Sequence, residues 1–307
     1  MALAGSGTLD GEVVAVAAVR GTWRRVWLGA VLGCGVVLLA GCAASTAGAP
    51  AMPSGTPSAT APPTSGESST ERAVPLYYVT DTPAGPRLAR EFRRVAVDTD
   101  PGTAALTALF AASTGAVPEH RNVWPAGSAL AGPVTHADGV VSVDLTAQAV
   151  GTTPADPILA VQQLVYTVTG ALGTTDPVQV LVAGKQVTRL WGDGVDTSRP
   201  VARADPLGIR VLVGIDDPAD GASVRSPVRI AGEAAVFEAT LLWEIRQNGS
   251  VVRSGSTSTA EGQRFAPYAF SVELPPGHYE IRVAEDDPSG GAGRPVMTDT
   301  RRITVIS

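Results

Sequence analysis

Residues 154–172 read PADPILAVQQLVYTVTGAL, and they decide the fold class of the first half of the chain. Apolar side chains recur there three and four residues apart, at Ile158, Val161, Leu164, Val165, Val168 and Leu172. This spacing places them on one stripe of an α-helix. Asp156 followed by Pro157 is a typical helix start, and Gly170 or Gly173 can end it. We therefore expect a helix over 154–172, with its stripe turned toward a core.

Short strands are expected on both sides of this helix. Upstream, residues 74–79 and 88–97 are rich in β-branched and aromatic side chains, and a break in the alternation near Arg93 predicts a bulge. Downstream, residues 178–182 read VQVLV and lead into a turn at Gly184. Predicted strands therefore both precede and follow this helix in the sequence.

A second helix and a hairpin complete this half. Asp100 before Pro101 predicts a helix start, and Leu106, Leu109 and Phe110 follow as its apolar face. Asp138-Gly139 predicts a tight turn that joins strands over 128–136 and 140–146. The expected order is β-β-α-β-β-α-β-β. It predicts a small α+β domain with two helices on one face of its sheet.

Five short stretches of this half carry a family resemblance. They are 76–79 (LYYV), 141–146 (VSVDLT), 162–169 (QQLVYTVT), 180–185 (VLVAGK) and 198–200 (SRP). In this order and spacing they resemble the GerMN domain of sporulation and spore germination, over residues 73–204. The resemblance implies a domain that is not known as an enzyme and that acts through protein contacts.

From residue 205 onward the pattern is strand and turn only. Strands are expected over 209–215, 228–232, 240–247, 251–252, 268–274, 278–284 and 301–306. Asn248-Gly249 predicts a type I′ hairpin between two of them. About seven short strands in ~100 residues predict an all-β immunoglobulin-like sandwich over residues 205–307.

Four residues are predicted to form the core of this sandwich. Trp243 lies in mid-strand, where such a sandwich keeps a core tryptophan. Ile230 and Ile281 lie roughly where the inter-sheet disulfide would be, and Tyr279 precedes Ile281 by the two residues of a tyrosine corner. Residues 235–243 (AVFEATLLW), with Ser226-Pro227 and 277–279 (GHY), resemble the immunoglobulin-like domain of bacterial spore germination.

The first 41 residues predict a secretory signal. Arg20, Arg24 and Arg25 precede an uncharged run over 26–40, which is too short to span a bilayer comfortably. The run ends in LAGC at 39–42, which resembles the bacterial lipobox. The resemblance implies cleavage before Cys42, a diacylglycerol on its thiol, palmitate among the acyl groups, and an anchor at the outer face of the cytoplasmic membrane. An ordinary signal peptide or an uncleaved anchor are the alternatives, and both also place the rest of the chain outside the cytoplasm.

Residues 42–72 form a predicted tether. They consist largely of Ala, Ser, Thr, Pro and Gly, with too few large apolar groups to offset chain entropy. We therefore expect disorder. About 30 such residues reach roughly 30 Å as a coil and roughly 90 Å when extended.

The composition supplies few of the residues that commonly act in catalysis or bind metal ions. A net charge of −6 without a strongly basic domain argues against nucleic acid as a partner. The chain has three His and two Cys, and the signal and the lipid would remove both thiols. We expect no cofactor and no metal, since no histidines have ligand spacing and the chain lacks a Gly-x-Ser-x-Gly elbow.

Three charged groupings leave alternatives open. The acidic groups Asp216, Asp217, Asp220 and Glu285, Asp286, Asp287 could meet at one end of the sandwich and hold Ca²⁺, or they could cap turns. The basic residues Arg87, Arg90, Arg93 and Arg94 could contact an anionic wall polymer or lipid, or form a solvated strand face.

The sequence thus predicts a non-catalytic cell-envelope lipoprotein. Its tethered modules would bind envelope proteins or cell-wall glycan, in sporulation, germination or general envelope assembly. The alternative is an enzyme that modifies peptidoglycan, or an accessory subunit of one. A carboxylate pair in one cleft, such as Asp144 with a second acid, would favour that alternative.

Overall fold

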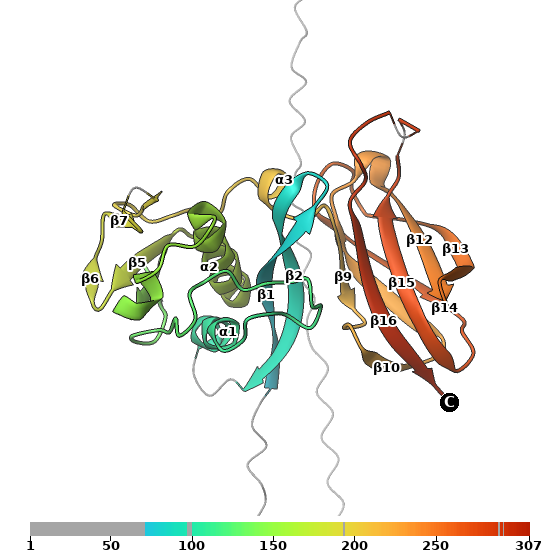
Figure 1. Ribbon diagram of the computed structural model, residues 1–307, viewed down its shortest axis with the longest axis horizontal. Coiled ribbons are helices and arrows are strands. Elements are labelled where there is room, and N and C mark those ends of the chain that lie inside the picture. The colour runs from blue at the N-terminus through green and yellow to red at the C-terminus, as the bar shows by residue number, and fades with distance from the viewer. Residues whose placement is uncertain (1–70, 97–99, 193, 288, 291) are drawn as a thin grey trace, which may run out of the picture. The chain divides into compact units, whose positions relative to one another are not determined.

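The computed structural model describes residues 71–96, 100–192, 194–287, 289–290 and 292–307 (Figure 1). The predicted signal peptide, Cys42 and all of the predicted tether except Glu71 and Arg72 lie outside these residues. Those two residues already belong to the first strand, so the tether cannot extend to residue 72 as predicted.

Strands β1 (Glu71–Thr82) and β2 (Gly85–Ala96) form an antiparallel two-stranded ribbon. Their register runs without a shift from Glu71 opposite Ala96 to Thr82 opposite Gly85. The bulge predicted near Arg93 is therefore wrong, and both strands begin earlier than the sequence pattern indicated.

The two predicted helices are confirmed, with their caps. Helix α1 (Pro101–Phe110) begins after Asp100, whose carboxylate accepts a hydrogen bond from the amide of Thr103 at 2.8 Å. Helix α2 (Pro157–Leu172) begins after Asp156 in the same way, and it ends at Gly173, whose φ of 68° is left-handed. These local signals act within one turn of each helix end, which is why the sequence pattern located them.

Four strands form the sheet of the first half, in the order β3-β4-β5-β6. Strands β4 (Val140–Leu145) and β5 (Val178–Val182) are parallel and joined through α2, while β3 (Thr135–Ala137) and β6 (Lys185–Gln186) pair antiparallel at the edges. The strand predicted over 128–136 is thus largely wrong. Two shorter strands, β7 (Arg189–Leu190) and β8 (Val195–Asp196), form a separate pair.

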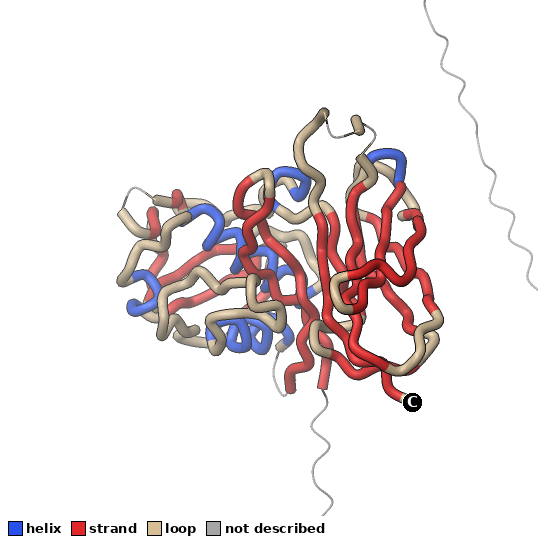
Figure 2. The backbone as a smooth tube through the Cα atoms, turned by 45° about the vertical axis from the view of Figure 1, so that its right-hand side comes forward, coloured by secondary structure: helices blue, strands red, loops and turns tan. Residues whose placement is uncertain are grey.

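Helix α2 is buried on nearly every side, between the β1–β2 ribbon and the four-stranded sheet (Figures 1 and 2). Val161, Leu164 and Val168 pack into the main core, while Leu159 and Tyr166 pack with residues of the ribbon. Ile158, predicted to lie on the buried stripe, is 61% exposed. The prediction of helices on one face of a single sheet is therefore wrong, because the ribbon forms its own layer on the other side.

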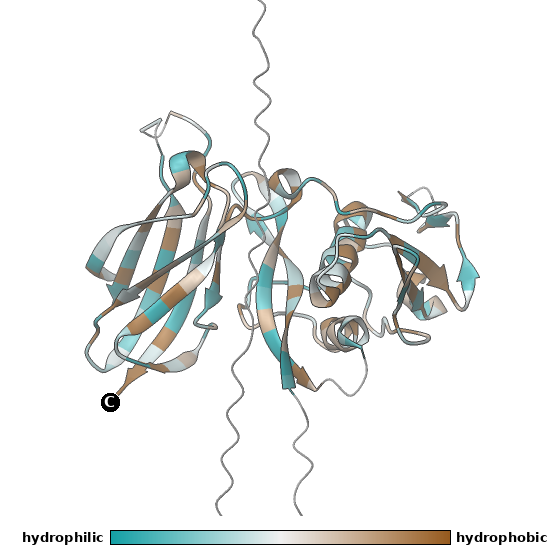
Figure 3. Ribbon diagram, turned by 180° about the vertical axis from the view of Figure 1, so that it is seen from behind, coloured by the Kyte–Doolittle hydropathy of each residue, from teal (hydrophilic) through white to brown (hydrophobic). Residues whose placement is uncertain are grey.

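The second half begins with a four-residue helix, α3 (Pro206–Ile209), and the strand predicted over 209–215 begins only at Val213. Eight strands follow: β9 (Val213–Asp217), β10 (Ala222–Arg225), β11 (Val228–Ala234), β12 (Thr240–Gln247), β13 (Ser250–Ser258), β14 (Ala266–Val272), β15 (Gly277–Glu285) and β16 (Thr298–Ile306). They form a three-stranded sheet, β14-β11-β9, and a five-stranded sheet, β10-β16-β15-β12-β13. Apolar and polar residues alternate along these strands (Figure 3), as expected of a two-sheet sandwich.

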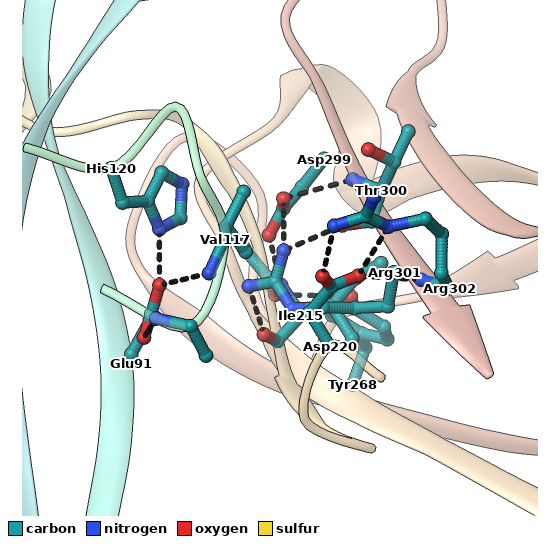
Figure 4. A network of polar contacts seen from close by, with 12 residues as sticks. Glu91, Val117, His120, Ile215, Asp220, Tyr268, Asp299, Thr300, Arg301 and Arg302 are labelled. Atoms are coloured by element: carbon teal, nitrogen blue, oxygen red, sulfur yellow. Dashed lines mark hydrogen bonds and ion pairs between the residues drawn. The ribbon is translucent and has the colours of Figure 1, made fainter. Parts of the chain in front are cut away.

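A buried ion pair joins the two sheets of the sandwich (Figure 4). Arg301 of β16 is 2% exposed and pairs with Asp299 at 2.5 Å. Asp299 accepts a hydrogen bond from the amide of Ile215 at 2.7 Å, and Arg301 donates to the carbonyl of Ile215 at 2.7 Å. The pair therefore satisfies both main-chain groups of one residue of β9, so the ions and the backbone are buried without losing partners.

Candidate functional site

The four residues predicted for the sandwich core occupy different depths. Ile230 and Ile281 lie in opposite sheets and are fully buried in one cluster. The hydroxyl of Tyr279 donates to the carbonyl of Pro275 at 3.0 Å, which is the hydrogen bond of a tyrosine corner. Trp243 is only half buried: it stacks on Phe270 with ring centroids 4.9 Å apart at the edge of the cluster.

The three histidines each have a partner of their own. His120 lies 2.7 Å from Glu91, His136 lies 2.7 Å from Asp176, and His278 lies 3.0 Å from the hydroxyl of Thr304. Among the described residues, no group of three or more His, Cys, Asp or Glu side chains is placed to hold a metal ion.

The two acidic groups lie at opposite ends of the sandwich. Asp220 pairs with Arg302, which lies beside Glu280, whereas Glu285 follows the far end of the β15–β16 pairing and binds Arg294 at 2.6 Å. Of the two alternatives left open by the sequence, a Ca²⁺ site formed by both groups at one end is therefore contradicted, and the capping role agrees with the contacts. Their carboxylates accept hydrogen bonds from arginines and main-chain amides, such as those of Arg302 and Met297.

Asp144 faces a turn and not a second acid. Both of its carboxylate oxygens lie 3.0 Å from the amide of Gly184, in the turn between β5 and β6. This contact stabilises the turn, which carries a left-handed Ala183 and Gly184. Asp144 thus has a structural partner in the position where the enzyme alternative would need a carboxylate pair.

Glu91 of β2 and His120 of the loop that follows α1 form a buried pair (Figure 4). Burial acts to raise the pKa of Glu91, but the hydrogen bonds from His120 and from the amides of Ala116 and Val117 outweigh it and lower the pKa. The ionised carboxylate therefore holds the loop that follows α1 against β2.

Two of the four basic residues of β2, Arg87 and Arg90, contact the second domain, whereas Arg93 and Arg94 have no ion pair among the described residues. Arg90 binds Asp216 of β9 through two hydrogen bonds, at 2.5 and 3.1 Å, and lies 2.9 Å from Glu233 of β11. Arg87 donates to the carbonyls of Leu207 and Arg210. These two arginines therefore hold the immunoglobulin-like sandwich against the ribbon, so the solvated strand face expected from the sequence is wrong for them.

A groove of about 680 Å³ lies between the open end of the β1–β2 ribbon and the last turn of α2. Three arginines line it: Arg72 of β1, Arg90 of β2, and Arg203 from the segment after β8. Tyr77 and Phe92 contribute aromatic surface, and residues 169–175 contribute three threonines. None of its described lining residues is an Asp or Glu. The sequence pattern located the arginines of β2, but it gave no signal for Arg203.

The floor of the groove is a close approach between α2 and β1. A Cβ atom on Gly170 would lie 3.0 Å from the Pro75 ring and 3.5 Å from Tyr77, so a glycine allows the two elements to meet. Arg203 donates to the hydroxyl of Thr169 at 2.8 Å and stacks over Tyr166, 4.9 Å from the ring centroid. These contacts hold the Arg203 guanidinium at the groove wall.

Comparisons with known proteins were made for each half of the chain. Residues 75–188 match the family described as sporulation and spore germination, and residues 212–292 match the immunoglobulin-like domain of bacterial spore germination. No curated protein matches the chain significantly in sequence. Within the described residues, no helix has the length and hydrophobicity of a membrane-spanning segment.

Three solved structures illustrate the similarity. The tandem GerMN domains of the sporulation protein GerM from Bacillus subtilis share 15% identity, over 66% of this chain and 62% of theirs, with a TM-score of 0.37. The first GerMN domain of that protein shares 19% identity over 44% of this chain and 99% of its own length, with a TM-score of 0.34. A putative lipoprotein from Clostridium perfringens shares 20% identity over 43% and 87%, with a TM-score of 0.30.

The chain thus spans less than two thirds of the tandem-domain structure. The two family matches follow one another without overlap. The chain therefore combines a sporulation and spore germination domain with an immunoglobulin-like domain of bacterial spore germination.

Proposed function

We propose that the protein is a non-catalytic lipoprotein of the cell envelope. Lipid on Cys42 would anchor it to the outer face of the cytoplasmic membrane, and residues 42–70 would tether the folded part. The folded part would bind envelope proteins or cell-wall glycan. The observation that carries this proposal is the order of the segments: an apolar run ending in LAGC, a polar tether, and then two domains of sporulation and germination families.

The described side chains support binding more than catalysis. Each histidine and the candidate acid Asp144 already has a partner that stabilises a turn, a loop or a strand. The arginine groove of about 680 Å³ is open to a ligand, and Arg72 and Arg203 in its lining have no ion-pair partner among the described residues. Neither matching family is a family of known enzymes.

The anchor is tested with two cysteine variants and metabolic labelling by palmitate. We expect the native chain to be labelled and to fractionate with membranes, and Cys42→Ala to remain unlabelled and unprocessed. Cys34→Ala is the matched control, because this second cysteine lies within the apolar run of the signal. An unlabelled native chain, or a Cys42→Ala chain that is still labelled, would contradict the proposed anchor.

The enzyme alternative is tested on purified peptidoglycan with the mature chain from residue 42. We expect no release of soluble fragments, with or without divalent metal ions. Turnover that Asp144→Asn abolishes without changing the melting temperature would establish the alternative.

A further inference from the structure

Two of the three arginines that line the groove beside α2 have no ion-pair partner among the described residues. Arg90 is paired with Asp216 and Glu233, whereas neither Arg72 nor Arg203 has a carboxylate partner among the described residues. Arg94 is equally unpaired there, and it stands opposite Ala73 in the ribbon. Directly opposite residues share one face of a ribbon, so Arg94 adds its charge to the groove side.

The groove wall is preorganised for an anion. Arg203 is half buried, and burial lowers its pKa below the usual value of an arginine. Its Nε is committed to Thr169, which leaves the two terminal nitrogens without a described acceptor. A guanidinium in this state binds phosphate or carboxylate oxygens through paired hydrogen bonds.

Two of the last carbonyl groups of α2 are already hydrogen-bonded and so present less negative charge to such a ligand. The amide of Gly173 donates to the carbonyl of Gly170 at 3.3 Å, and the amide of Thr174 donates to the carbonyl of Thr169 at 3.0 Å. The exposed Thr175 then offers a hydroxyl group to the groove, whereas the hydroxyl of Thr174 already accepts a hydrogen bond from the amide of Asp176 at 3.1 Å. Phe92, 42% exposed, offers an aromatic edge beside them.

We propose that this arginine groove binds a linear anionic polymer, one whose repeating sugar or polyol units carry phosphate or carboxylate groups. The arginines would bind the anionic groups, and Thr175 and Phe92 would contact the hydroxyl-bearing units between them. The proposal deepens the proposed function by naming the class of ligand, and it rests on an extracytoplasmic location.

The test uses the full mature chain from residue 42, carrying Cys42→Ala so that no lipid is attached. Fluorescence anisotropy measures its binding to labelled poly(glycerol phosphate) and to labelled polygalacturonate, with neutral dextran as the uncharged probe. We expect binding to at least one of the two anionic polymers, none to dextran, and a fall in affinity as salt is raised. Co-sedimentation with phosphatidylcholine vesicles containing one fifth phosphatidylglycerol tests whether the chain binds an anionic membrane surface instead.

Three variants assign the binding to the groove. Arg203→Gln and Arg72→Gln should each weaken binding by about tenfold, since each removes a charge-assisted contact. Arg72 is exposed and has no described side-chain contact, so its variant keeps the fold intact. Arg199→Gln, at an exposed arginine of the same domain outside the groove, should bind as the unsubstituted chain does.

Several results would overturn the proposal. They are binding to neither anionic polymer, equal binding by all three variants, or sedimentation with anionic vesicles without polymer binding. Because this chain lacks the lipid, failure here leaves the Cys42 experiment unaffected, and the two proposals can fail separately.

Discussion

At the scale of single residues, two buried ion pairs of this protein also form hydrogen bonds with main-chain groups. Glu91 accepts from His120 and from two loop amides, and Arg301 with Asp299 binds both main-chain groups of Ile215. These hydrogen bonds help to offset the desolvation penalty of buried charges, which the attraction within an isolated ion pair often does not offset. These residues therefore act in stability, although their chemical types would suit a catalytic site.

Glu91 gives a prediction about acid stability. Its pKa is lowered in the folded state, so its contribution is complete above the unfolded value of about 4.3 and is lost as the pH falls through the folded value. Glu91→Gln should lower the unfolding free energy at pH 7 by about 1–3 kcal/mol.

Urea unfolding followed at pH 7, 5 and 3 measures both effects. We expect the difference between native chain and Glu91→Gln to shrink toward pH 3, where the native carboxylate becomes protonated. Glu119→Gln, at an exposed acid of the same loop, is the control. A difference that stays constant between pH 7 and pH 3 would show that the charge of Glu91 is irrelevant.

At the scale of elements, the three-stranded sheet depends on one close backbone approach. The pairing of β11 with β9 shifts register between Ala231 and Gly232. A Cβ atom on Gly232 would lie 1.9 Å from the carbonyl oxygen of Gly214 and 2.8 Å from the hydroxyl of Tyr268. That hydroxyl itself donates to the Gly214 carbonyl at 3.0 Å, so no larger residue fits without separating the strands.

Gly232→Ala should therefore destabilise the sandwich by about 3 kcal/mol, because the clash is with backbone and cannot be relieved by a side-chain rotation. Gly214→Ala is the matched control across the same strand pair, since its Cβ would meet nothing closer than 3.8 Å. Thermal unfolding followed by circular dichroism measures both variants. Equal melting temperatures for the two would mean that the strands separate without cost.

At the scale of the whole molecule, residues 71–307 belong to one compact unit, and charged side chains join its two domains. Arg90 of the ribbon binds Asp216 and Glu233, and Arg210, which also pairs with Glu233, stacks over Tyr77 of the ribbon. Burial acts to lower the pKa of Arg90, but the hydrogen bond with Asp216 and the charge of Glu233 raise it. The guanidinium therefore stays charged at the junction.

Arg90→Met should uncouple the two domains. It removes the partner of Asp216 and one partner of Glu233, and breaking a buried ion pair costs about 3 kcal/mol or more. In differential scanning calorimetry we expect one transition for the native chain and two for the variant. Arg229→Met, which removes an exposed ion pair with the adjacent Asp217, should leave the single transition unchanged. One unchanged transition for Arg90→Met would show that the arginine does not couple the domains.

The sequence by itself determined the features that act over a few residues. The caps at Asp100 and Asp156, the left-handed Gly173, and the turns at Asp138-Gly139 and Asn248-Gly249 all appear where the pattern predicted them. The tyrosine corner at Tyr279 was also predictable from the sequence, because its hydrogen bond spans only four residues. In each case the residues that supply the signal also supply the contact.

The tertiary structure alone decided which charges are paired and which remain free. Arg90 and Asp216 lie 126 residues apart, and nothing in the pattern of β2 distinguishes Arg90 from the unpaired Arg94. The stripe of α2 was likewise an incomplete guide to burial: Ile158 on the stripe is exposed, whereas Gln163 and Thr167 outside it are buried. A stripe shows which residues can pack, but not which layers will cover the helix. Charge pairing and layering depend on contacts between segments distant in the sequence, and the arginine groove exists only where three such segments meet.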